Sequence, residues 1–263
     1  MLRTSTLRSA ILASLVAASA ALPLTATASH SWGGYHWART SNPFTLKLGD
    51  NLSPGWDSYL GTTSSDWSKS TVLDTTIVAG SANPKNCRAS AGRIEVCNSS
   101  YGKTGWLGVA QVWVSGIHIT QATVKVNDTY FNTATYNTTA WRNLVMCQEV
   151  GHTLGLDHQD TIFGNGNLGT CMDYTNLPDT NQHPNQHDYD ELVIIYGPLD
   201  SSTSVGQTMF SGMMPPGLSD TDFSIPAQWG TKIRVTNRGW TELYEFDLGH
   251  GQKVFTFVIR ARE

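Results

Sequence analysis

The sequence is poor in charged residues and has no excess of basic ones. Only 14% of the 263 residues are charged, and 17 Lys and Arg stand against 21 Asp and Glu, which gives a formal net charge of −4. We therefore expect no nucleic-acid partner, since binding to phosphates depends on clustered positive charge. With 40% hydrophobic residues, the chain can bury a large core and is neither disordered nor fibrous.

Long apolar runs are scarce, and the clearest one lies near the N-terminus. Arg3 and Arg8 precede an apolar run over residues 10–22, and Ala-Thr-Ala follows at residues 26–28. This order is typical of a secretory signal peptide over residues 1–28, although a buried N-terminal helix is an alternative. The run is too short to span a bilayer, so we expect no membrane partner and a secreted protein, either extracellular or periplasmic. Without the leader, 15 basic and 21 acidic residues give a net charge of −6.

Cysteine is also rare. The chain has four cysteines, all beyond the leader: Cys87, Cys97, Cys147 and Cys171. An even number in an exported chain indicates two disulfides, for which three pairings are possible. No two of the cysteines have C-x-x-C spacing, so we expect no zinc site built from the four thiolates.

The apolar pattern predicts a mixed α and β fold. Strands are expected at residues 44–48, 72–78, 93–96, 108–114 and 117–126. Helices are expected after Ser53-Pro54, from Trp141 with Thr138 or Thr139 as N-cap, and over residues 185–195. Residues 199–218 are typical of a linker, and residues 219–263 of a small antiparallel β region with strands near 232–235, 241–246 and 254–259.

The second predicted helix carries the residues with the clearest chemistry. Gln148 and His152 are four residues apart and share one face, so both can bind one ion, while Glu149 lies beside them. Gly155 can turn the chain back, which lets His158 approach the same ion. Imidazole is a preferred zinc ligand, and a catalytic zinc needs three protein ligands with one position left for water.

This stretch resembles the metzincin zinc peptidases, in particular the matrixins. Their pattern H-E-x-x-H-x-x-G-x-x-H is followed by a methionine turn. Four letters of the pattern match, at Glu149, His152, Gly155 and His158. Met172, in Cys-Met-Asp-Tyr, resembles the methionine of the turn. The resemblance implies an α+β fold of the α/β/α metzincin type over residues 29–198, with a mixed twisted sheet, the active-site helix, the Met-turn and a C-terminal helix.

The resemblance also implies a function. It implies a secreted zinc-dependent endopeptidase that hydrolyses peptide bonds with a metal-activated water, and in which Glu149 is the general base. Gln148, His152 and His158 would be the metal ligands, and Tyr174 would steady the oxyanion. Members of this family bind an extended peptide along an edge strand, for which residues 108–114 are the candidate. We expect a monomer with a protein or peptide substrate, and a structural Ca²⁺ stays open.

The chain departs from the family at the first ligand, where Gln148 replaces histidine. An amide oxygen is less basic than imidazole and suits calcium or magnesium better than zinc, so zinc should bind about 10- to 100-fold more weakly, or weaker still. One alternative is a site without an ion, in which Gln148 hydrogen-bonds backbone carbonyls or water. Another is that His183 or His187 is the third metal ligand in place of Gln148. The alternative functions are a catalytically inactive metzincin-like binding protein and a metalloenzyme that acts on a non-peptide bond.

The motif also suggests how the cysteines pair. Cys147 precedes Gln148 and Cys171 precedes Met172, so a bridge between these two cysteines would tie the active-site helix to the Met-turn. The other two cysteines, Cys87 and Cys97, would then close a short local loop.

Overall fold

The computed structural model describes residues 29–160, 162, 164–208, 223–236 and 239–261. The expected signal peptide and much of the expected linker lie outside these ranges. Within them, no helix is both long enough and apolar enough to cross a membrane.

One mixed sheet forms the centre of the protein. Its strands are β1 (His36–Trp37), β2 (Phe44–Asn51), β3 (Leu73–Ala79), β4 (Ile94–Ser99), β5 (Trp106–Ser115), β6 (His118–Asn127), β7 (Thr231–Thr236), β8 (Thr241–Gly249) and β9 (Gln252–Arg260). The order across the sheet is β3-β2-β4-β6-β5-β9-β8-β7, and β1 pairs with the start of β6. The strands from β3 to β6 are parallel, whereas those from β6 through β5 to β7 are antiparallel.

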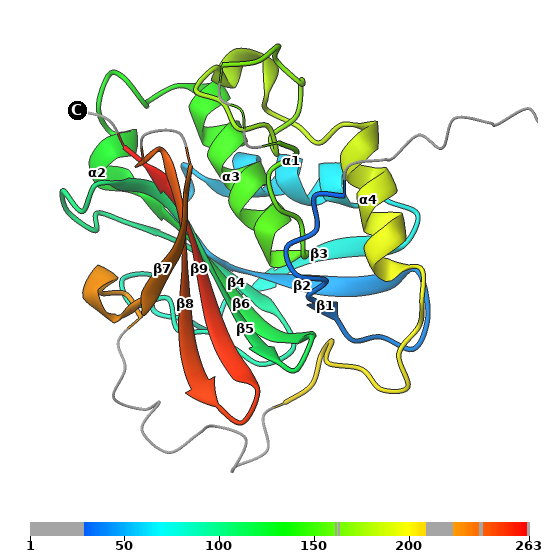
Figure 1. Cartoon of the computed structure of the whole chain (residues 1–263). Helices are drawn as coiled ribbons and strands as arrows, with labels where there is room; N and C mark the ends of the chain where they lie inside the picture. The colour runs from blue at the N-terminus through cyan, green and yellow to red at the C-terminus, as the bar shows by residue number, and fades with distance from the viewer. Residues whose placement is uncertain (1–28, 161, 163, 209–222, 237–238, 262–263) are drawn as a thin grey trace, which may run out of the picture.

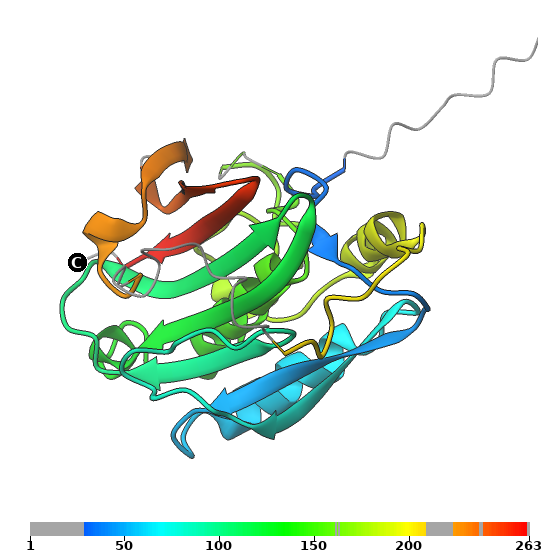
Figure 2. The ribbon, with the colours of Figure 1, turned by 90° about the horizontal axis from the view of Figure 1, so that it is seen from below.

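The helices confirm the expected mixed α+β class. They are α1 (Asp57–Trp67), α2 (Asp128–Phe131), α3 (Thr139–Thr153) and α4 (Gln186–Tyr196), with short 3-10 turns at Pro178–Thr180 and Pro226–Gln228. Helices α1, α3 and α4 lie on the same side of the sheet (Figure 1). Seen from below, the strands pass in front of α1 and α3, and α4 lies beside the sheet (Figure 2). Apolar residues of α1 and α3 pack between these helices and the sheet in the main core.

Local sequence signals fix both ends of α3. The Thr138 side chain accepts a hydrogen bond from the backbone N–H of Trp141, which is the expected N-cap. After the helix, Gly155 has a φ of +96°, and a Cβ at this position would lie 2.4 Å from the backbone oxygen of Tyr35. Only glycine accommodates both the left-handed backbone and this close approach, so the chain turns back here as the sequence predicts.

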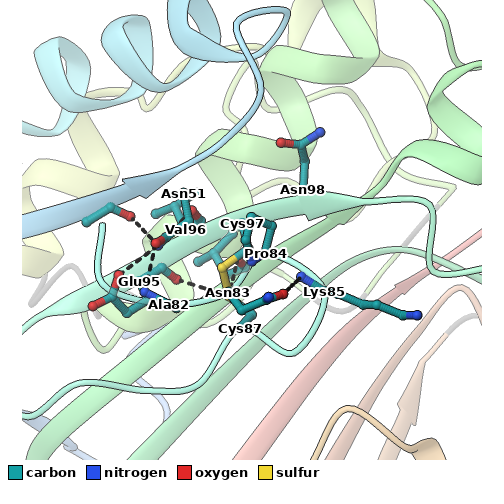
Figure 3. Close-up of a disulfide and its surroundings, with 12 residues drawn as sticks. Asn51, Ala82, Asn83, Pro84, Lys85, Cys87, Glu95, Val96, Cys97 and Asn98 are labelled. Carbon is teal, nitrogen blue, oxygen red and sulfur yellow. Dashed lines mark hydrogen bonds between the residues drawn. A yellow bond between two sulfur atoms is a disulfide. The ribbon is translucent and has the colours of Figure 1, made fainter. Parts of the chain in front are cut away.

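Both disulfides predicted from the sequence are present. Cys147 in α3 is bonded to Cys171, and Cys87 is bonded to Cys97 in β4 (Figure 3). The first bridge joins α3 to the turn that contains Met172. All four cysteines, which lie within the described residues, are thus in disulfides.

The last three strands form the predicted antiparallel meander, and this meander continues the main sheet. Strand β9 pairs along the whole of β5, from Trp106 to Ser115. The expectation that residues 108–114 form an edge strand is therefore wrong, because β5 is paired with β6 on one side and with β9 on the other. Residues 254–259 of β9 are all buried, as is typical of a strand covered on both faces.

Residues 198–208, where the predicted linker begins, run back along the N-terminal segment. The backbone N–H groups of Asp200 and Ser204 donate to the carbonyls of Arg39 and Ala38, each at 2.9 Å. The described part of the predicted linker is therefore held against the residues that follow strand β1.

Candidate metal centre

The two histidines of the motif lie side by side. His152 is in the last turn of α3, and His158 follows the turn made by Gly155. Their ring centroids are 4.8 Å apart, with the rings close to perpendicular. Both side chains are largely buried, His152 at 2% exposure and His158 at 8%. Two imidazoles from different chain segments thus converge at the end of the helix.

Hydrogen bonds indicate which nitrogens are available to a ligand. Nδ1 of His152 lies 2.9 Å from the backbone oxygen of Leu156. A carbonyl only accepts, so Nδ1 donates and the lone pair is left on Nε2. Nε2 of His158 is buried and has no hydrogen-bond partner among the described residues. In metal-binding histidines, one ring nitrogen usually binds the metal while the other donates its proton to a carbonyl, as Nδ1 of His152 does here.

The charge state of His152 is set mainly by its burial. Burial, aided by the neighbouring His158, lowers the pKa of His152 to about 3, so its imidazole is neutral at pH 7. A neutral imidazole is the form that binds a metal ion.

Gln148 lies in a small pocket, on the side of α3 that also carries His152. Its side chain is 2% exposed and forms part of the pocket wall. The residues that line the pocket are Leu107, Trp141, Gln148, Tyr174, Thr175, Trp240, Thr241 and Ile259. Tyr174 links this pocket to the histidines, because its ring centroid lies 5.3 Å from that of His158. The cavity volume of about 10 Å³ is close to the space that one water molecule needs.

Glu149 lies deep between α3 and β5. It is 1% exposed, and no described side chain pairs with its carboxylate. Burial raises the pKa of Glu149 well above its usual value, and the backbone N–H of Ala110 opposes this only in part. A Cβ at Gly108 would lie 2.7 Å from Oε1 of Glu149, so the absence of a side chain at Gly108 leaves room for the carboxylate.

Met172 lies against α3 at Gly151, where an added Cβ would be 2.5 Å from its Sδ atom. It is fully buried, and its backbone oxygen accepts a hydrogen bond from Gln159, next to His158, at 2.7 Å. The neighbouring Cys171 carries the disulfide to α3. The turn is thus joined to both segments that supply the histidines.

The C-terminal strands add residues that the motif did not indicate. Phe257 of β9 stacks on the ring of His152, with centroids 4.2 Å apart and an interplanar angle of 12°. Arg234 of β7 donates two hydrogen bonds to Asp157, at 2.5 and 2.6 Å. Burial alone would raise the pKa of Asp157, but bonds with His158 and Arg234 hold it below its usual range. No local sequence signal links these strands to the motif, since the contacts span about 80 to 100 residues.

No protein-family model matches this chain, and no curated protein does either.

The other two histidines considered from the sequence have different partners. Nδ1 of His183 lies 2.6 Å from a carboxylate oxygen of Asp66 in α1. The ring of His187, in the first turn of α4, stacks on His30 at 4.8 Å. Neither contact includes the histidines of the motif.

Proposed function

We propose that this protein is a secreted zinc-dependent endopeptidase of the metzincin type. The observation that carries the proposal is the pair formed by His152 and His158, whose rings lie 4.8 Å apart and whose Nε2 atoms are free to bind an ion. The signal-like leader and the two disulfides support an oxidising compartment outside the cytosol.

The donor set fits a zinc ion. His152 and His158 would supply two imidazole nitrogens, and the amide oxygen of Gln148 would be the third ligand. The buried Nε2 of His158 has no other partner among the described residues, so an ion would remove the cost of leaving that nitrogen unsatisfied. When bound, zinc supplies Lewis-acid chemistry, because it polarises a carbonyl and lowers the pKa of water towards about 7.

Glu149 and Tyr174 would carry out the proton and charge chemistry. Burial raises the pKa of Glu149 above that of an exposed glutamate. In the proposed mechanism its carboxylate would take a proton from the attacking water and pass it to the leaving amine. The Tyr174 side chain lies beside His158, and it would stabilise negative charge on the carbonyl oxygen of the substrate. Met172 and the disulfide at Cys171 would keep the supporting turn rigid.

Access to the site depends on the C-terminal strands. The pocket at Gln148 has room for about one water molecule, and Trp240, Thr241 and Ile259 form part of its wall. A peptide therefore needs this wall to move before it reaches the histidines.

A second candidate function is a binding protein that keeps the site without turnover. It is favoured by the same covered wall and by the pairing of β5 with β9, which occupies the strand edge that a peptide substrate would use. The presence of Glu149 within the motif favours the peptidase, since a binding protein has no need for a base there.

The test compares the mature wild-type protein with Glu149→Gln on a set of fluorogenic peptides. We expect zinc in both proteins, hydrolysis by the wild type that a chelator abolishes, and a loss of about 100- to 10,000-fold in the variant. Zinc binding without hydrolysis of any peptide would indicate the binding protein. Hydrolysis that is unchanged in Glu149→Gln would contradict the mechanism.

A further inference from the structure

A second histidine cluster lies outside the site described above. It consists of His36 in β1, His118 in β6 and Asp200 in the segment after α4, and we call it the β1–β6 cluster. The Nε2 atoms of His36 and His118 lie 3.3 and 3.1 Å from the same oxygen of Asp200, Oδ1. The two rings are 5.1 Å apart and nearly perpendicular.

The sheet register brings these residues together. Strands β1 and β6 are parallel, and His36 is paired directly with His118, so the two side chains leave the same face. The segment after α4 then passes alongside, where the Asp200 N–H donates to the Arg39 oxygen at 2.9 Å. Backbone pairing therefore sets the positions of all three side chains.

The hydrogen bonds of His36 leave its Nε2 atom without a proton, and this atom faces the carboxylate of Asp200. Nδ1 of His36 lies 2.9 Å from the backbone oxygen of Gly34, which can only accept, so Nδ1 carries the proton of a neutral ring. Nε2 then presents a lone pair to Oδ1 of Asp200. Two acceptors that face each other at 3.3 Å require a proton or a cation between them.

The other oxygen of Asp200 is already occupied. Oδ2 accepts from Nη1 of Arg39 at 2.6 Å and from the backbone N–H of Arg39 at 3.1 Å. Arg39 is buried and is itself held by the backbone oxygens of Tyr196 and Pro198. This arrangement fixes the carboxylate and turns Oδ1 towards the histidines, as the outer partners of a metal ligand do.

We propose that the β1–β6 cluster binds a divalent transition-metal ion of the zinc type through Nε2 of His36, Nε2 of His118 and Oδ1 of Asp200. Ligand atoms at about 2.0–2.2 Å from a tetrahedral zinc ion lie about 3.3 Å from one another. The two measured separations, 3.3 and 3.1 Å, match this spacing. Two imidazoles and a carboxylate suit zinc and its neighbours better than calcium or magnesium.

The expected role of this ion is structural. It would join the N-terminal strand, the start of β6 and the segment after α4, which are far apart in the sequence. The side chain of His118 is 34% exposed, so water can complete the coordination. No buried general base comparable to Glu149 accompanies the cluster among the residues described for it.

The test uses the full-length mature chain in the His158→Ala background, which disables the site at α3. The protein is stripped with a chelator, dialysed against buffered zinc and analysed for metal content and thermal unfolding. We expect one zinc per chain in His158→Ala, and a rise in Tm on adding zinc. Adding His118→Ala should weaken zinc binding at least about 100-fold and remove the rise in Tm.

Two further variants serve as controls for this test. His250→Asn, at an exposed histidine in the β8–β9 turn, is the matched control and should keep the zinc. If His118→Ala does not fold, His118→Gln keeps a polar side chain of similar size and should show the same loss. Absence of zinc from the His158→Ala chain, or retention in His158→Ala/His118→Ala, would overturn the proposal. Neither result depends on peptide hydrolysis, so the function proposed for the site at α3 is tested separately.

Discussion

In both histidine pairs, one imidazole donates through Nδ1 to a backbone carbonyl, from His152 to Leu156 and from His36 to Gly34, each at 2.9 Å. The surroundings differ. The pair at α3 is enclosed beneath Phe257, whereas His118 of the β1–β6 cluster is one-third exposed. We refer to the first pair, together with Gln148, as the α3 site.

The third ligand also differs. The α3 site offers a neutral amide and has a buried carboxylate nearby, Glu149, while the β1–β6 cluster offers the charged carboxylate of Asp200 directly. A carboxylate binds a cation more strongly than an amide does, but the raised pKa of Glu149 is what proton transfer needs. If both proposals hold, the α3 site would favour proton transfer over zinc affinity, and the β1–β6 cluster would favour zinc affinity.

The largest effect should come from Phe257→Ala, which removes the ring stacked on His152. We expect the free energy of unfolding to fall by about 3–5 kcal/mol, as for other buried phenylalanines, and zinc affinity at the α3 site to fall about 10-fold. Urea denaturation and competition with a zinc-binding dye measure the two quantities. Zinc at the β1–β6 cluster should be unaffected.

The matched control for this variant is Phe255→Ala. Phe255 lies on the same strand and is also buried, but it packs against Trp32 and Tyr35 rather than a histidine. It should lose similar stability and keep its zinc affinity at both sites. Equal weakening of zinc in the two variants would show that the stacking contact is not what supports the α3 site.

The next effect concerns the disulfides. Replacing Cys147 and Cys171 by serine opens a bridge that spans 24 residues, for which chain entropy predicts a loss of about 3.5 kcal/mol. The same change at Cys87 and Cys97, 10 residues apart, should cost about 2.7 kcal/mol. Only the first pair should also weaken zinc at the α3 site, as measured by dye competition. Weakening by both pairs would mean that the bridge to Met172 has no special part.

A smaller change is expected from Gln148→His, which restores the ligand of the metzincin pattern. Zinc should bind the α3 site about 10- to 100-fold more tightly, because imidazole is more basic than an amide oxygen. The β1–β6 cluster provides the internal control, since its affinity should not change. Equal or weaker binding at the α3 site would show that Gln148 is not a ligand.

The smallest effect is on the pH dependence of stability and concerns Glu95, far from both sites. Burial alone would raise the pKa of Glu95, but hydrogen bonds outweigh burial and lower it. The donors are Ser90, Asn51, Ser81 and Arg93. Glu95 and Asn51 lie beside the Cys87–Cys97 bridge (Figure 3).

Because the folded pKa is below the unfolded value of 4.5, this contribution is complete above about pH 4.5 and is lost as pH falls through the folded pKa. Glu95→Gln should therefore flatten the acid limb of the unfolding free energy measured by urea between pH 3 and 7. Asp74→Asn, at an exposed position on β3, should leave it unchanged.

Local signals predicted much of this structure, and contacts between distant segments account for the rest. Thr138 and Gly155 each lie within one turn of an end of α3, so short sequence patterns predict where the helix begins and ends. They also predict the return of the chain towards His158. The β-branched and aromatic residues at 254–259 predict strand β9 but do not identify its neighbour, so the sequence does not predict its pairing with β5. The same limit applies to Phe257, which reaches His152 only through that pairing.

The place of β9 also has a consequence for the nascent chain. All residues of α3 are synthesised about 100 positions before the strand that closes over His152, so the helix and β5 emerge long before residues 252–260. Until those residues arrive, β5 has one unpaired edge, which is a surface that invites pairing with another chain. Maturation of the site is therefore coupled to completion of the polypeptide, and a chain truncated before β9 would expose its histidines and aggregate.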